Sequence, residues 1–108
     1  MSRPATLAPA AQKDLRAAVA WIARDNETAA RALRAAVSVA ARRIGERPEI
    51  GRLRPELTSS RYRFWSLSGF PYLLVYDVSA VPPRIARVLH MARDLPTALM
   101  SLDPPSGE

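Results

Sequence analysis

The sequence of 108 residues has no cysteine and a single histidine, His90. The lack of cysteine excludes a disulfide scaffold, a thiolate nucleophile and a cysteine-ligated metal site. One imidazole is too few for a histidine-rich metal site, so we expect neither a metal nor a cofactor. The four glycines form neither a P-loop nor a dinucleotide-binding fingerprint, and no Gly-x-Ser-x-Gly elbow is present. Nucleotide-driven chemistry and serine hydrolysis are therefore not expected.

Long apolar runs are also missing. No run approaches the roughly 18 residues that a membrane span needs, and no signal-type apolar core follows the N-terminus. We therefore expect a cytoplasmic protein with no membrane partner. The length suits one small domain with one core. We expect residues 1–102 to form that domain and residues 103–108 to be a disordered tail.

The charge is basic and carried almost entirely by arginine. Sixteen Lys and Arg residues stand against ten Asp and Glu residues, and Lys13 is the one lysine among them. Guanidinium groups pair with carboxylates and phosphates in a bidentate geometry, so acidic protein segments or polyanions would be favoured partners. The alternative is a solvated basic surface that binds nothing.

The first half of the chain has helical periodicity. Pro9 suits a first helical turn, and apolar residues at helical spacing predict a helix over about 10–24. Asn26 can cap a second helix over about 27–46. Its apolar stripe consists of Ala30, Leu33, Val37, Ala40 and Ile44, and its polar stripe of Glu27, Arg31, Arg34, Ser38 and Arg42. A short turn between the two helices predicts an antiparallel hairpin.

The second half has the signature of strands. Residues 61–67, 72–78 and 84–90 are β-rich, and short connections join them into an antiparallel meander. The helical hairpin needs an apolar surface to cover, and one face of this sheet is the available one. Residues 4–8 are a candidate edge strand. The expected fold is α+β, in the order β-α-α-β-β-β, with a possible helical turn at 97–100.

A basic cluster near the sheet offers one candidate chemistry. Arg61 and Arg63 are two residues apart, so we expect them on one strand face, and Arg87 and His90 lie on the last strand. A metal-independent ribonuclease could hold a phosphate with these arginines and use His90 as general acid or base. The competing interpretation, which we favour, is that His90 anchors the loop that follows the strand.

Several short motifs together resemble the ParE branch of the RelE/ParE toxins of bacterial type II toxin–antitoxin modules. The similarity covers about residues 4–100 and is most specific over 70–96. The matching motifs are Pro9-Ala10-Ala11, Asp14-Leu15, Pro48-x-x-Gly51, Phe70-Pro71-Tyr72-Leu73, Val75-Tyr76, Arg87-Val88-Leu89-His90, Arg93-Asp94 and Pro96. The resemblance implies a helical hairpin packed on a small antiparallel sheet.

The resemblance also implies a function without catalysis by the toxin. Such a toxin poisons DNA gyrase, blocks replication and is held inactive by a ParD-like antitoxin in a hetero-oligomer; sequence-specific nucleic-acid binding is not expected. From their expected exposure, the antitoxin-binding candidates are Trp21, Arg31, Arg34 and Arg42. The target-binding candidates are Arg87, His90 and Arg93.

Two alternatives remain open at this stage. One is the RelE branch, whose members are ribosome-dependent ribonucleases; here the catalytic set would be His90, Arg61, Arg63 and Arg87. The other is a degenerate member that binds an antitoxin without being toxic. The proline-rich connection at Pro82 and Pro83 is stiffer than a simple hairpin, and the sequence assigns no role to it.

Overall fold

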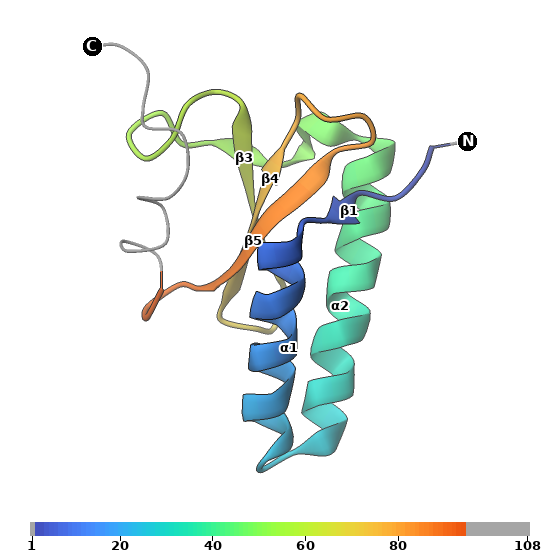
Figure 1. Ribbon diagram of the computed structural model, residues 1–108, viewed down its shortest axis with the longest axis vertical. Coiled ribbons are helices and arrows are strands. Elements are labelled where there is room, and N and C mark those ends of the chain that lie inside the picture. Colours follow the sequence, from blue (N-terminus) through green and yellow to red (C-terminus); the bar gives the residue numbers. More distant parts are fainter. Residues whose placement is uncertain (1, 95–108) are drawn as a thin grey trace.

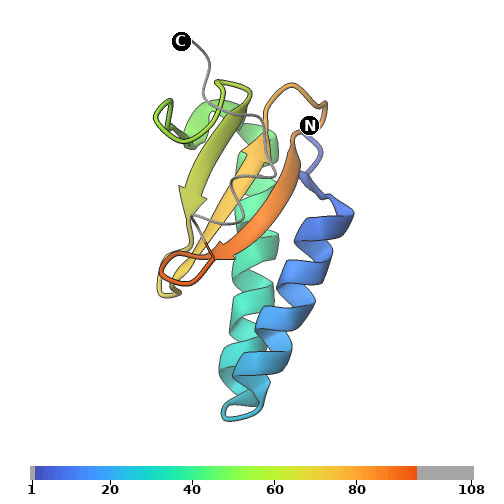
Figure 2. The ribbon, with the colours of Figure 1, turned by 60° about the vertical axis from the view of Figure 1, so that its left-hand side comes forward.

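Two long helices lie against one face of a five-stranded sheet in the computed structural model, which describes residues 2–94 (Figure 1). In the turned view the strands lie in front of the upper part of α2, and the helical hairpin extends below the sheet (Figure 2). This arrangement confirms the α+β class and the expected element order. The helical turn expected at 97–100 and the tail at 103–108 lie outside the described residues.

The helices begin and end close to the predicted positions. Helix α1 spans Pro9–Ala23 and helix α2 spans Glu27–Glu46. Pro9 occupies the first turn of α1, where its missing N–H is not needed. Asn26 caps α2, since its side-chain oxygen accepts the backbone N–H of Ala29 at 2.9 Å. Neither helix is long and apolar enough to cross a membrane, within the part of the chain that is described.

The sheet has the strand order β1-β5-β4-β3-β2. Its strands are β1 (Thr6–Leu7), β2 (Arg52–Leu53), β3 (Tyr62–Ser66), β4 (Tyr72–Asp77) and β5 (Arg84–His90). The three strands of the expected meander pair antiparallel. Two details differ from the sequence prediction. The edge strand β1 pairs with β5 in parallel, so the sheet is mixed, and β2 is an additional short strand that pairs with β3.

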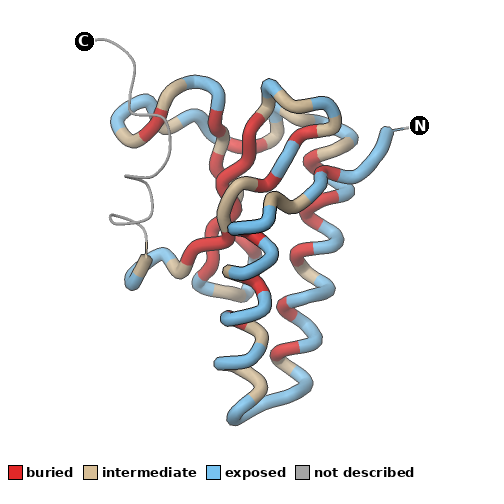
Figure 3. Tube along the Cα trace, viewed as in Figure 1, coloured by how far each residue is buried: buried red, intermediate tan, exposed pale blue. Residues whose placement is uncertain are grey.

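Each face of the sheet buries its own set of apolar side chains. On the helix side, the apolar stripes of α1 and α2 pack against Leu74, Tyr76, Ile85 and Val88. The opposite face has a smaller buried cluster formed by Tyr62, Phe64, Leu73, Val75 and Leu89. Figure 3 shows buried residues recurring along the inner sides of both helices and throughout the central strands. The predicted stripe of α2, including Leu33 and Ile44, is fully buried.

A buried tyrosine explains the Pro48-x-x-Gly51 motif. The 3-10 helix η1 (Pro48–Ile50) connects α2 to β2. The Tyr76 hydroxyl donates to the Pro48 carbonyl and accepts the Gly51 N–H at 2.8 Å. A Cβ at Gly51 would lie 2.6 Å from that hydroxyl, so only glycine leaves room for the contact. Burial raises the pKa of Tyr76, against the opposing effect of the Gly51 hydrogen bond.

Candidate functional site

A hollow of about 440 Å³ lies between β1 and the two helices. We call it the groove. Its apolar surface comes from the strand residue Leu7 and from buried helix residues whose side chains also belong to the core. Arg34, Ser38 and Arg42 provide its polar border. The residues that line it are Pro4, Ala5, Leu7, Leu15, Arg34, Val37, Ser38, Ala41 and Arg42.

The polar stripe of α2 runs beside its buried stripe. Arg31, Arg34, Ser38 and Arg42 recur at three- to four-residue spacing, and of these Arg34, Ser38 and Arg42 line the groove whereas Arg31 does not. All four are exposed. None of the three arginines forms an ion pair with another residue in the described range 2–94. Their guanidinium groups are therefore available to carboxylates of a partner.

Trp21 occupies a different surface. It follows Asp14 by seven residues, or two helical turns, so both lie on the same side of α1. Its side chain is 60% exposed, and the Arg24 guanidinium stacks 4.8 Å above the ring centroid. Trp21 is not among the residues that line the groove. The four antitoxin-binding candidates thus divide into the arginines of α2 and a separate tryptophan.

Arg87, a target-binding candidate, is engaged within the fold. Its Nε donates to Asp14 Oδ2 at 2.7 Å and its Nη2 to Asp14 Oδ1 at 3.0 Å. The hydrogen bonds to Asp14 raise the pKa of Arg87, and burial opposes them only in part. The guanidinium thus holds α1 against β5, so a role in binding a target would have to compete with this contact.

His90 is part of a closed turn at the end of β5. Its Nδ1 accepts the Arg93 N–H at 3.2 Å, and its own N–H donates to Asp94 Oδ2 at 3.0 Å. The ring also packs edge-on against Tyr72, with centroids 5.3 Å apart. The Arg93 guanidinium hydrogen-bonds Asp94 and thereby lowers the pKa of that carboxyl. This geometry matches the favoured interpretation of His90 as a loop anchor.

The structure does not bring the candidate nuclease residues together. Arg61 pairs with Asp77 at 2.8 Å at one end of β4, whereas His90 is the strand partner of Tyr72 at the other end. The two ends are roughly 16 Å apart at ~3.3 Å per residue. Arg63 instead donates to the main-chain carbonyls of Glu49 and Gly51. Arg61 and Arg63 therefore stabilise different parts of the fold and share no described partner.

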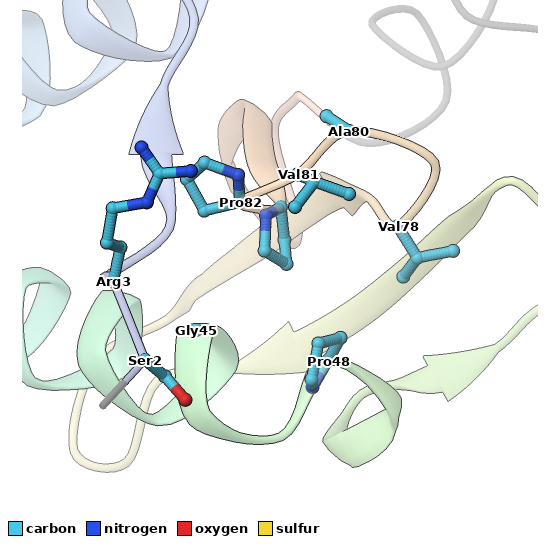
Figure 4. Close-up of a pocket in the computed structure, with 9 residues that line it drawn as sticks. Ser2, Arg3, Gly45, Pro48, Val78, Ala80, Val81 and Pro82 are labelled. Carbon is cyan, nitrogen blue, oxygen red and sulfur yellow. The ribbon is translucent and has the colours of Figure 1, made fainter.

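A second hollow, which we call the loop pocket, lies where the β4–β5 connection meets the end of α2 (Figure 4). Its volume is about 270 Å³. Loop residues such as Val81 and Pro82 form one side, and Gly45 and Pro48 form the other. Val81 is 87% exposed. The run Val81-Pro82-Pro83 is visible in the sequence, but the wall opposite it becomes apparent only from the fold.

The lining of the two hollows offers surface for binding a partner. Within residues 2–94, no group of three His, Asp or Glu side chains is placed to hold a metal ion. Neither hollow is lined by His90, the one imidazole of the chain, or by a carboxylate from the part of the chain that the structure describes. Apolar surface bordered by guanidinium groups can accommodate an amphipathic segment that carries acidic side chains.

Comparison with known proteins identifies one family. The family model described as ParE toxin of type II toxin-antitoxin system, parDE, matches residues 5–95, most of the chain. The match includes both helices, all five strands and every residue of the groove except Pro4. No curated protein sequence matches the chain significantly.

Proposed function

The chain belongs to the ParE toxin family of type II toxin–antitoxin systems, and we propose that it inhibits DNA gyrase and is neutralised by a ParD-like antitoxin. Membership of this family implies that the chain is the toxin of a type II toxin–antitoxin system and that it has an antitoxin partner. The identity of the target and the type of antitoxin are the proposed part. Inhibition of gyrase would block replication and stop growth, and neutralisation would occur through a complex of the two proteins.

The groove is the observation that carries the antitoxin part of the proposal. It combines an apolar surface from Leu7 and Leu15 with the exposed Arg34 and Arg42. An amphipathic antitoxin segment would bury apolar side chains against the former and place carboxylates beside the latter. Charge-assisted hydrogen bonds of this kind are among the stronger polar contacts, and charge complementarity speeds association.

The separation of the basic residues supports a toxin that acts by binding. General acid–base catalysis requires the catalytic group within hydrogen-bonding reach of the atoms that react. Arg61, Arg63 and Arg87 are instead held by Asp77, by two carbonyls and by Asp14, and His90 lies in its own turn. A nuclease built on these four residues would need a large rearrangement.

A purified-component assay tests the proposal. Gyrase supercoiling and gyrase-dependent DNA cleavage are measured with the toxin alone and with the toxin premixed with the antitoxin encoded beside it. Inhibition that the antitoxin reverses, with accumulation of cleaved DNA, is expected. A folded toxin that stops growth but leaves gyrase unaffected would contradict the proposal. Messenger RNA cleavage on translating ribosomes, measured in parallel, would then identify the RelE-type alternative.

A further inference from the structure

The groove and the loop pocket share a wall. This wall is the N-terminal strap, residues 2–5, which crosses the C-terminal part of α2. Pro4 and Ala5 line the groove, whereas Ser2 and Arg3 line the loop pocket. On α2, Arg42 belongs to the groove, and Gly45, about one helical turn further on, belongs to the loop pocket. The two hollows are therefore consecutive along the same helix.

The backbone of the strap is in close contact with the backbone of α2. The Ala5 N–H donates to the Ala41 carbonyl at 2.9 Å, which fixes the strap on the helix. A Cβ on Gly45 would lie 2.1 Å from the Arg3 carbonyl oxygen. The absence of a side chain at Gly45 thus lets the strap backbone rest directly on α2. The strap therefore lines both hollows in succession, with Pro4 and Ala5 in the groove and Ser2 and Arg3 in the loop pocket.

The two hollows also have the same chemistry. Each is mainly apolar, and the charged side chains that line them are Arg34 and Arg42 for the groove and Arg3 for the loop pocket. Among residues 2–94, no acidic side chain lines either hollow. The loop pocket is slightly smaller than the ~300–1,000 Å³ usual for small-molecule sites, so one or two side chains would fill it. One acidic, amphipathic chain would therefore match both hollows.

We propose that the groove and the loop pocket form one bipartite antitoxin site, an inference that rests on the proposed neutralisation at the groove. The antitoxin follows the strap from the groove to the loop pocket and places an apolar side chain against Val81 and Pro82, with carboxylates near Arg3 and Arg42. Arg34 and Gly45 are about 17 Å apart along α2 at ~1.5 Å per residue. The bound segment must therefore contain about eleven helical residues or five extended ones.

Site-specific labelling tests the proposal directly because the chain has no native cysteine. The Val81→Cys variant is labelled with a solvent-sensitive fluorophore and titrated with the antitoxin encoded beside the toxin. Leu53→Cys is the matched control, since Leu53 is also exposed but lies on β2, at the opposite edge of the sheet from β1. We expect a blue-shifted emission from the label at position 81 that saturates with complex formation, and no shift from the label at position 53.

The possible outcomes separate this proposal from the one on which it rests. A stable complex without a shift from position 81 would overturn the bipartite site and leave neutralisation at the groove intact. A shift produced by gyrase and not by antitoxin would overturn it in favour of a target-binding pocket. If no complex forms between the two folded proteins, the proposed neutralisation itself fails, and this inference fails with it.

A binding measurement gives a second, independent test. Val81→Asp is expected to weaken antitoxin binding by about tenfold, because an introduced carboxylate would replace an apolar contact and repel an acidic segment. Val81 is almost fully exposed, so the variant should keep the wild-type fold. Leu53→Asp introduces the same charge at the opposite edge and should bind as tightly as the wild type. Equal affinities for the wild type and Val81→Asp would overturn the proposal.

Discussion

Asp14 and Arg87 connect the first helix to the last strand across 73 residues of sequence. The same carboxylate also accepts the backbone N–H of Val88 at 3.0 Å. Strand β1 pairs with β5 only at Arg84 and Ile85. Just beyond the point where β1 ends, Asp14 supplies the hydrogen-bond acceptor for a backbone N–H at the edge of β5. A carboxylate in this position closes an edge that could otherwise pair with another chain.

The Asp14→Asn variant should lower the free energy of unfolding by about 1–3 kcal/mol, because it leaves the Arg87 guanidinium without its charged partner. Both side chains are partly buried, so solvent only partly compensates for the loss. Urea denaturation measures the change. Asp25→Asn is the control, since Asp25 is exposed and its side chain has no ion pair or hydrogen bond within the described part of the chain. Equal losses in both variants would contradict a specific role for Asp14.

Acid should destabilise the fold in part through Asp77. Burial raises the pKa of this carboxyl, but hydrogen bonds from Ser79 and Arg61 outweigh burial and lower it below its ordinary value. A lowered pKa in the folded state stabilises the protein above the unfolded-state pKa of about 3.9, and the stabilisation is lost as pH falls through the folded-state value. Melting temperatures from pH 7 to pH 2.5 should therefore fall less steeply below about pH 4 for Asp77→Asn than for the wild type.

Removing the Tyr76 hydroxyl should loosen the connection between α2 and the sheet. In Tyr76→Phe, the Gly51 N–H loses its buried acceptor and the Pro48 carbonyl loses its donor, at a cost of about 1–3 kcal/mol. Hydrogen exchange at the Gly51 amide should become faster than in the wild type. Tyr62→Phe, on the other face of the sheet, serves as the comparison. Unchanged protection at Gly51 would show that its hydrogen bond to Tyr76 is not maintained in solution.

Charge reversal at the groove should slow antitoxin association. The double variant Arg34→Glu, Arg42→Glu replaces two exposed cations with anions, and we expect an association rate about tenfold lower with a weaker dependence on salt. Arg52→Glu reverses an exposed charge at the β2 edge and should behave like the wild type. Surface plasmon resonance at two ionic strengths measures the rates. An equal decrease for Arg52→Glu would indicate general charge attraction without a defined site.

His90→Gln should preserve toxicity. The glutamine side-chain oxygen can accept a hydrogen bond from Arg93 N–H as His90 Nδ1 does, so the turn at the end of β5 can be retained. Growth inhibition after induction is the readout, with circular dichroism to establish folding. The nuclease alternative predicts the opposite, because loss of a general acid–base group usually reduces the rate by about 10²–10⁴-fold. Loss of toxicity in the folded variant, accompanied by loss of RNA cleavage, would favour that alternative.

Local signals predicted most of the fold. The limits of α2, predicted at about 27–46, agree with the structure because Asn26 caps the helix and Pro48 follows its end. Strand β2 could not be predicted, since Arg52 and Leu53 are both exposed and two residues show no alternation. The parallel direction of β1 was also unpredictable. It depends on how the helical hairpin returns the chain to the sheet, which local periodicity does not encode.

Less of the candidate site than of the fold could be predicted from the sequence. The exposure of Arg34 and Arg42 follows from helical periodicity, but the groove exists only because Leu7 and Leu15 come together beside them. The expectation that Arg61 and Arg63 lie on one strand face did not identify a site, because Asp77 binds Arg61 and main-chain carbonyls bind Arg63. Such partners are distant in sequence, and no spacing rule connects them.

The pairing of Thr6 with Arg84 also affects when the sheet can form during synthesis of the chain. The ribosome makes β1 before the two helices, whereas β5, the strand that holds β1, is made after them. The helical hairpin consists of local contacts and can form early, whereas the long-range pairing must wait for β5. One wall of the groove is therefore put in place only after β5 has been made. We expect the antitoxin to recognise the chain once β1 and β5 have paired and not before.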